Sequence, residues 1–133
     1  RNSKNIEHTL NAITSKKFIQ LHLKNKHFYH LDTCLFILNS ETAFYYRPAF
    51  DQKSLKILEE SFSDLVEVSK KEADNFALNC VVHKNSVLIQ TGNPFMTQEI
   101  KNRNYTPIEL DLSEFMKAGG GIHCLTQILD YQI

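Results

Sequence analysis

Three stretches of the chain begin in the same way and decide the expected fold: Thr33-Cys34-Leu35-Phe36, Asn79-Cys80-Val81-Val82 and His123-Cys124-Leu125-Thr126. In each, a polar residue precedes a cysteine and a mostly apolar run follows, as at the start of a buried strand. The intervals between the cysteines are 46 and 44 residues. A near-constant interval of this size is typical of a repeated supersecondary unit. The spacing therefore predicts a structural repeat.

The sequence between the cysteines predicts what one unit contains. Turns at Asn39-Ser40 and Asn85-Ser86 follow the first strands and lead into second strands. Prolines 46 residues apart, Pro48 and Pro94, then precede helical sequence and an outgoing strand. The expected unit is strand, strand, helix, strand, which makes the fold class α/β. The second strands are expected at 42–46 and 87–90, the helices at 52–61 and 96–103, and the last strands at 65–68 and 108–112.

Incomplete units are expected at both ends of the chain. Residues Ile6, Leu10 and Ile13 recur at helical spacing, and a strand is expected to follow at 18–23. A further strand is expected at 125–129. The 133 residues then form a single domain (1–133), divided into a half unit 1–25, full units 26–70 and 71–115, and a half unit 116–133. Because repeated units cover one another's apolar faces, we expect a part of a ring that another chain or a missing segment completes.

Two short helices have recognisable starts. The pattern Ser69-x-x-Glu72 matches a capping box, in which the two side chains cap each other's backbone amides. Ser113 is expected to begin a second short helix over Glu114 to Met116.

The composition excludes several classes of partner. The 15 Lys and Arg residues balance 15 Asp and Glu residues, which disfavours binding to nucleic acid or to an anionic membrane. No apolar run approaches the roughly 20 residues that span a bilayer, and residues 1–15 lack the apolar core of a signal peptide. Three widely spaced cysteines do not form a disulfide framework. We expect a protein of the cytoplasm that contacts neither membrane nor nucleic acid.

Cys124 is the strongest candidate nucleophile. It follows three consecutive glycines, Gly119, Gly120 and Gly121, which let the backbone approach a ligand closely. A thiol placed after such a loop can reach into a cleft. The alternative is that the glycines end a helix over 115–118 and that Cys124 is a small buried apolar residue.

His30 and Asp32 lie at the entry to the first strand of the first full unit, and Cys124 lies at the same end of its own expected strand. Equivalent positions around a ring would bring the three together. A histidine stabilises a thiolate and transfers protons. A carboxylate can bind a planar cationic substrate. The alternative for His30 is an ordinary solvated loop histidine.

Other combinations are weaker. Cys34 and Cys80 run into apolar strands, the setting of inert core thiols. A zinc site formed by His22, His27, His30 and Cys34 matches no common ligand spacing. The aromatic stretch 44–47 is more typical of a hairpin core than of base stacking.

Several blocks of this sequence resemble the C-terminal half of the amidinotransferase and dimethylarginine dimethylaminohydrolase superfamily. The two most specific are His-Leu-Asp-Thr-Cys at 30–34 and Gly-Gly-Gly-x-x-Cys-Leu-Thr at 119–126. Further resemblance lies in 66–80 and 109–118. The resemblance implies the pentein fold, a five-bladed α/β propeller of ββαβ units, of which about half would be present.

The resemblance also implies a chemistry and roles for particular residues. Cys124 corresponds to the nucleophile that attacks the guanidinium carbon and forms a covalent thiouronium intermediate. His30 corresponds to the general acid and base, and Asp32 to a residue that contacts the guanidinium, while Gly120 and Gly121 are expected to approach the substrate. No cofactor and no metal ion is expected.

One family feature is missing. Members carry a Glu-Gly-Gly-Asp type segment, whose carboxylates hold the guanidinium, in the first half of the family sequence, and we expect these residues to be the C-terminal portion of a protein about twice as long. We therefore expect a hydrolase that cleaves a C–N bond of arginine or methylated arginine and that is inactive without its other half. The alternatives are transfer of the amidino group to an amine, and a catalytically silent pentein binding module.

Overall fold

The computed structural model describes residues 6–14 and 18–127, which contain two three-stranded sheets of the same topology. In each sheet the first two strands are antiparallel, and the third is parallel to the second, which is central. The first sheet consists of β1 (Leu35–Ile37), β2 (Thr42–Tyr45) and β3 (Asp64–Glu67), and the second of β4 (Val81–His83), β5 (Ser86–Gln90) and β6 (Thr106–Leu110).

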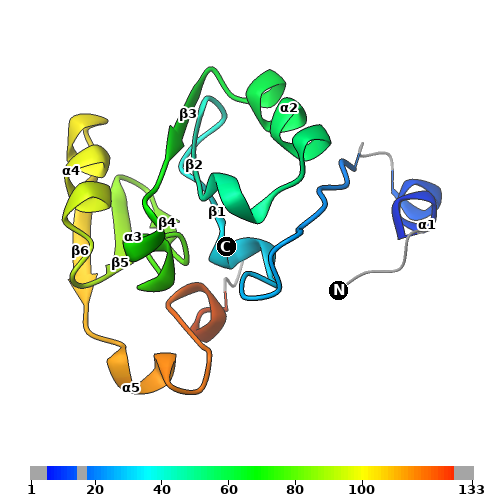
Figure 1. The fold of residues 1–133 in the computed structure, drawn as a ribbon. Helices are drawn as coiled ribbons and strands as arrows, with labels where there is room; N and C mark the ends of the chain where they lie inside the picture. Colours follow the sequence, from blue (N-terminus) through cyan, green and yellow to red (C-terminus); the bar gives the residue numbers. More distant parts are fainter. Residues whose placement is uncertain (1–5, 15–17, 128–133) are drawn as a thin grey trace, which may run out of the picture.

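A helix connects the two parallel strands of each sheet. Helix α2 (Gln52–Ser61) lies between β2 and β3, and α4 (Pro94–Asn102) lies between β5 and β6. Figure 1 shows both sheets between these two helices. The predicted unit of strand, strand, helix, strand is thus confirmed twice. Helix α4 begins two residues before the predicted start because Pro94 suits the first turn, where its missing N–H has no partner to lose.

The remaining elements are short. They are α1 (Ile6–Ile13), α3 (Lys70–Asp74), α5 (Ser113–Met116) and the 3-10 turns η1 (Leu31–Thr33), η2 (Arg47–Ala49) and η3 (His123–Leu125). Helix α1 agrees with the helical spacing of its apolar residues and is set apart from the two sheets in Figure 1. None of the helices in the described part of the chain is both long and apolar enough to span a bilayer.

The core explains why the two cysteines mark the repeat. Cys34 and Cys80 immediately precede β1 and β4 and are buried together with Phe44, Val87 and Ile89 of the central strands. Both cysteines have their thiols against backbone carbonyls of the preceding turn. The aromatic stretch on β2 is core, as predicted, since Phe44 is fully buried.

Neither of the strands predicted near the two ends of the chain forms within the described residues. Residues 18–23 form only an isolated bridge between Leu23 and Phe50, outside both sheets. The strand predicted at 125–129 does not form at residues 125–127, because Leu125 ends η3 and the next two residues have no regular structure. Residues 128 and 129 of that prediction lie outside the described residues. The start of α5 also differs: Ser113 makes no side-chain cap, and its amide instead donates to Asp111 Oδ1 at 3.0 Å.

The predicted capping box is half correct. The Ser69 hydroxyl accepts a hydrogen bond from the Glu72 amide at 3.3 Å, which caps α3. The Glu72 carboxylate accepts instead from the amides of Phe95 (2.8 Å) and Met96 (3.0 Å). Glu72 is 5% exposed, so this buried carboxylate caps the N-terminus of α4 from another element.

We expect Glu72→Ala to lower the free energy of unfolding by about 2 kcal/mol, because the buried Met96 amide and the part-buried Phe95 amide lose their acceptor. Urea unfolding of the intact protein measures the loss. Glu114→Ala is the control, since the Glu114 side chain is 79% exposed and forms a surface ion pair with Lys117. Equal unfolding midpoints for the two variants would contradict the capping role.

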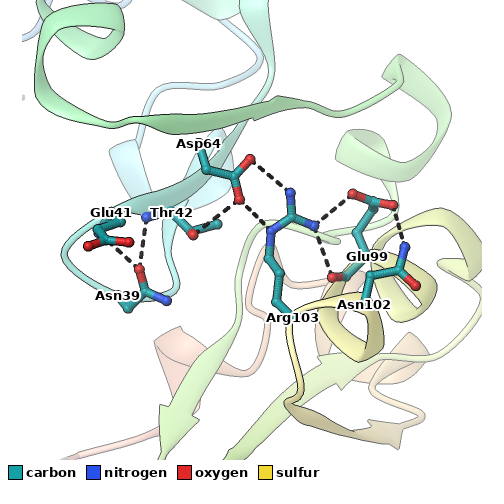
Figure 2. Close-up of polar contacts among 7 residues, drawn as sticks. All are labelled: Asn39, Glu41, Thr42, Asp64, Glu99, Asn102 and Arg103. Atoms are coloured by element: carbon teal, nitrogen blue, oxygen red, sulfur yellow. Dashed lines mark hydrogen bonds and ion pairs between the residues drawn. The ribbon is translucent and has the colours of Figure 1, made fainter.

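Arg103, at the end of α4, connects the second unit to the first (Figure 2). Its Nε lies 2.6 Å from Asp64 Oδ2 and its Nη2 lies 2.9 Å from Asp64 Oδ1, at the start of β3. Its Nη1 lies 2.7 Å from Glu99 Oε2. The guanidinium also covers the ring of Phe44, with 5.2 Å between its central carbon and the ring centroid. Arg103 therefore fixes α4 against the first sheet.

This contact makes stability depend on pH. The hydrogen bond from Arg103 holds the pKa of Asp64 below its usual range. A lowered folded-state pKa contributes stability that is present above the unfolded-state pKa, about 3.9, and is lost as the pH falls through the folded value. Because the Asp64 side chain is 43% exposed, we expect at most about 1 kcal/mol from it.

Asp64→Asn tests this dependence. The variant should be less stable than the wild type near pH 6, and the difference should shrink below about pH 4, where the wild-type carboxylate becomes protonated. Thermal unfolding of both proteins across this range measures the difference. A difference that stays constant with pH would show that the charge of Asp64 is not responsible.

Candidate functional site

Asp32 lies on the 3-10 turn η1, directly before the first sheet. The turn begins at His30, whose carbonyl accepts hydrogen bonds from the Thr33 amide (3.2 Å) and the Thr33 hydroxyl (2.6 Å). These local contacts fix the backbone of the turn, so that Asp32 is presented at the end of the first unit where β1 starts.

The glycine run ends helix α5, as the second interpretation of it predicted. Gly119 has φ +82°, and its amide donates to the Met116 carbonyl at 2.9 Å. The Gly120 amide donates to the Phe115 carbonyl at 3.3 Å. This pair of hydrogen bonds with a left-handed glycine is the Schellman motif. It turns the chain toward η3, which carries Cys124.

Gly121 packs closely against other residues of the chain. A Cβ atom at Gly121 would lie 2.5 Å from Asn79 Oδ1 and 2.8 Å from Phe76 Cδ1, closer than packed atoms come. A Cβ atom at Gly120 would lie 3.9 Å from its nearest neighbour, an ordinary contact. The close contact with Asn79 and Phe76 therefore explains why residue 121 is a glycine. Substrate binding by Gly120 and Gly121 stays a prediction.

Cys124 and Asp32 are 92 residues apart in sequence and in contact in the structure. The Cys124 Sγ lies 3.6 Å from Asp32 Oδ2 and 3.7 Å from Asn79 Oδ1. Cys124 is a free, exposed thiol. The alternative in which Cys124 is a buried apolar residue is therefore wrong, and a carboxylate stands beside an accessible sulfur.

His30 lies two residues before Asp32, with an exposed side chain. Its ring packs against that of Tyr29, with 4.5 Å between centroids. Within residues 6–14 and 18–127, no hydrogen bond joins the His30 imidazole to Cys124. The expected pairing of thiol and imidazole is thus not formed in this structure, and the acid–base role of His30 stays a prediction.

The other two cysteines are core thiols, as predicted. Cys34 is fully buried, and burial together with the charge of Asp32 raises the pKa of its thiol to about 12. Cys80 is 4% exposed, and burial raises the pKa of its thiol strongly. Neither thiol is available as a thiolate nucleophile. Among the residues that the structure describes, no group of three or more His, Cys, Asp or Glu is arranged to hold a metal ion.

Asn79, which no sequence pattern singles out as a site residue, connects the two parts of the site. Its Nδ2 donates to Asp32 Oδ2 (3.1 Å) and to the Asp32 carbonyl (3.2 Å), and its Oδ1 accepts from the His123 amide (2.9 Å). The one available indication was its position directly before Cys80, at the start of a buried strand. Its partners are 44 and 47 residues away, so local spacing does not identify them.

A groove of about 370 Å³ opens beside Asp32 between the first strands of the two units. Most of the side chains that line it are apolar. The exceptions are the polar side chains of Asp32 and His123 and the thiol of Cys80. The residues are Leu31, Asp32, Leu35, Phe36, Ile37, Leu78, Cys80, Val81, Val82 and His123. A carboxylate at one end of an apolar groove suits a ligand with a cationic head and an aliphatic body.

Comparison with known proteins identifies the family. The sequence model of the eukaryotic N,N dimethylarginine dimethylhydrolase family matches residues 2–129. The chain belongs to this family. Membership in the dimethylarginine dimethylaminohydrolase superfamily, expected from the sequence motifs, is therefore confirmed.

Curated members and relatives of this family share about one third of the residues. The N(G),N(G)-dimethylarginine dimethylaminohydrolase of Mycobacterium tuberculosis is 32% identical over 115 residues, which are 86% of this chain and 38% of that protein. The bifunctional arginine dihydrolase/ornithine cyclodeaminase AgrE of Nostoc is 34% identical over 110 residues, 81% of this chain and 16% of that protein.

Solved structures agree with the fold. The N-terminal domain of ArgZ, an arginine dihydrolase of cyanobacteria bound to its product, superposes with a TM-score of 0.88 at 28% identity. The match covers 94% of this chain and 46% of that domain. This dimethylarginine dimethylhydrolase family chain therefore spans less than half the length of these relatives.

Proposed function

We propose that the intact protein containing this chain hydrolyses a C–N bond of the guanidino group of arginine or a methylated arginine. One observation carries the proposal: the exposed Cys124 thiol lies 3.6 Å from the Asp32 carboxylate, at a distance of 92 residues in sequence. A guanidinium held by that carboxylate would have its central carbon within reach of the sulfur. The adjoining apolar groove suits the aliphatic part of the substrate.

The first half of the reaction forms a covalent intermediate. The Cys124 thiolate attacks the guanidinium carbon, and a C–S bond forms. The C–N bond to the leaving amine breaks, and the amine takes a proton from the His30 imidazolium. The amine departs, and a thiouronium remains on Cys124. For this step the exposed His30 side chain, which packs against the Tyr29 ring in this structure, would have to turn toward Cys124.

The second half consumes water. Neutral His30 accepts a proton from a water molecule, whose oxygen attacks the same carbon. The C–S bond breaks, the second proton of the attacking water passes to solvent, and the ureido product and the Cys124 thiolate are released. The imidazolium is restored, so both groups are ready for another cycle. Asp32 contributes by attracting the cationic guanidinium to the sulfur.

Relatives support the roles of a cysteine and a histidine. The N-terminal domain of ArgZ has been crystallised covalently bound to a reaction intermediate, and a variant with cysteine replaced by serine has been crystallised with substrate. A dimethylarginine dimethylaminohydrolase in which a histidine is replaced by glycine forms an adduct with S-methyl-L-thiocitrulline. These observations concern those proteins, and they favour the same class of chemistry for this chain.

We further propose that this chain is the C-terminal part of a pentein propeller in the cytoplasm, completed by its missing half or by a second chain. The repeated ββαβ units support this arrangement. Exposed apolar side chains at the start of the first unit also support it, since Leu31 is 43% and Ile37 is 53% exposed. The missing part would supply the further carboxylates that hold the guanidinium.

Product analysis in ¹⁸O-labelled water tests the reaction class. The intact protein is incubated with arginine and with methylated arginines, with and without an added primary amine. Hydrolysis predicts a ureido product that carries one ¹⁸O atom and release of ammonia or a methylated amine. An amidinated amine without ¹⁸O would show amidino transfer, and unchanged substrates would favour a binding module.

A further inference from the structure

Asn79 is a buried polar side chain whose position is set by its own loop. It is 1% exposed and lies between α3 and β4. Its backbone N–H donates to the Phe76 carbonyl at 3.0 Å. Phe76 has a left-handed backbone (φ +57°), which is unusual for an aromatic residue. This tight turn places Asn79 directly before β4.

The donor and the acceptor of the Asn79 side-chain amide contact different parts of the site. The Nδ2 group donates to the side chain and to the carbonyl of Asp32. The Oδ1 atom accepts from the His123 amide at 2.9 Å and lies 3.7 Å from the Cys124 sulfur. A second, longer bond of 3.4 Å joins the His123 amide to the Asn79 carbonyl.

The surroundings of Asn79 leave it little freedom. Gly121 packs so closely that an added Cβ atom would overlap Asn79 Oδ1. A buried amide with its donor and acceptor satisfied resists rotation, because any other orientation leaves a buried polar group without a partner. Asn79 therefore acts as a fixed spacer between the Asp32 carboxylate and the turn that carries Cys124.

We propose that Asn79 is a positioning residue: it sets the Asp32 carboxylate with its nitrogen and the Cys124 turn with its oxygen. The catalytic consequence rests on the proposed hydrolase function; the structural consequence does not. A misplacement of about 1 Å can cost on the order of a hundredfold in rate. Asn79 touches neither the departing amine nor the water in this scheme, so it acts through Asp32 and Cys124.

Two substitutions in the intact protein separate the two ends of the amide. Asn79→Asp keeps an oxygen for the His123 amide but loses the donor and sets a second carboxylate against Asp32. We expect it to raise KM by at least about tenfold, with a smaller change in kcat, because guanidinium positioning is lost. Asn79→Ala loses both contacts, and we expect kcat to fall by at least about tenfold as well.

Asn93→Ala is the matched control. Asn93 is a fully buried asparagine whose Nδ2 donates to the carbonyls of Asn75 and Gln90, remote from Cys124 in the contacts it makes. Its loss should lower the melting temperature but leave KM and kcat, expressed per folded molecule, within about threefold of the wild type. A purely structural role for Asn79 predicts the same behaviour for its variants.

Hydrogen exchange without substrate gives an independent result. We expect exchange in residues 121–125 to accelerate by at least about tenfold in Asn79→Ala, but not in Asn79→Asp or Asn93→Ala. Only the first removes the side-chain acceptor at 2.9 Å and leaves the His123 amide with the longer bond to the residue 79 carbonyl. Unchanged exchange in Asn79→Ala, or Asn79 kinetics equal to those of Asn93→Ala, would overturn the proposal. A wild-type protein that turns over no guanidino compound but shows the Asn79-dependent exchange would refute the hydrolase and support the positioning role.

Discussion

Cys124→Ala in the intact protein is expected to reduce turnover of guanidino substrates by at least about a thousandfold, because removal of a covalent nucleophile leaves only binding and electrostatic contributions. The effect should be on kcat, since the alanine side chain does not remove the Asp32 carboxylate that attracts the substrate. Steady-state release of amine, measured with and without the substitution, provides the test.

Cys34→Ala is the control for loss of a thiol. Cys34 is buried before β1, and its pKa is raised to about 12. We expect a stability loss of about 1 kcal/mol from the small cavity and the lost contacts, with turnover per folded molecule close to that of the wild type. Full activity in Cys124→Ala, or its loss in Cys34→Ala with the fold intact, would assign the nucleophile elsewhere.

Gly121→Ala is expected to have the second largest effect. The new Cβ atom would meet Asn79 Oδ1 at 2.5 Å and Phe76 Cδ1 at 2.8 Å, both held by the surrounding turn. Overpacking of this kind costs about 1–3 kcal/mol. Because relief requires movement of Asn79 or of the Cys124 turn, we also expect kcat to fall by about tenfold to a hundredfold.

Gly120→Ala is the neighbouring control, because its Cβ atom would lie 3.9 Å from the nearest atom and clash with nothing. We expect its stability to stay within about 0.5 kcal/mol of the wild type, and an effect on KM alone would report the expected approach of Gly120 to the substrate. Melting curves and kcat for both variants measure the contrast. If the two variants behaved alike, with KM as the parameter affected, the glycines would act by approaching the substrate and the packing argument at Gly121 would be wrong.

The repeat was predictable because two of its markers are core residues. Cys34 and Cys80 precede the first strand of each unit, and the small buried thiol suits that position in both sheets. The helix between the parallel strands was also predictable, since Leu55 and Leu58 face the core at helical spacing. The spacing of apolar residues indicates which face of an element is buried, so features that depend on burial within one unit can be predicted from the sequence.

The third marker was misleading. Cys124 lies at the same interval as the other cysteines but on a 3-10 turn, because Gly119 ends α5 and Gly121 allows the chain to fold against Asn79. The contact that determines this geometry is made by residue 79, far from the glycines in sequence. Interval and residue type alone do not distinguish an exposed thiol on a turn from a buried one at a strand.

Part of the site was predictable from the sequence. The sequence motifs and the repeat together placed Cys124 near Asp32, and the structure has the two side chains in contact. The pairing with His30 is not present in this structure, and Asn79 was missed. Glu72 shows a related failure: its local pattern predicted a capping box, but a tertiary contact directs its carboxylate to α4.

Rapid acid quenching of the intact protein during turnover, followed by peptide mass analysis, tests directly whether Cys124 is the nucleophile. We expect a substrate-derived amidino adduct on the peptide that contains Cys124, formed and lost at rates consistent with turnover. Steady turnover with no such adduct under any quench time, or an adduct on another residue, would contradict this assignment.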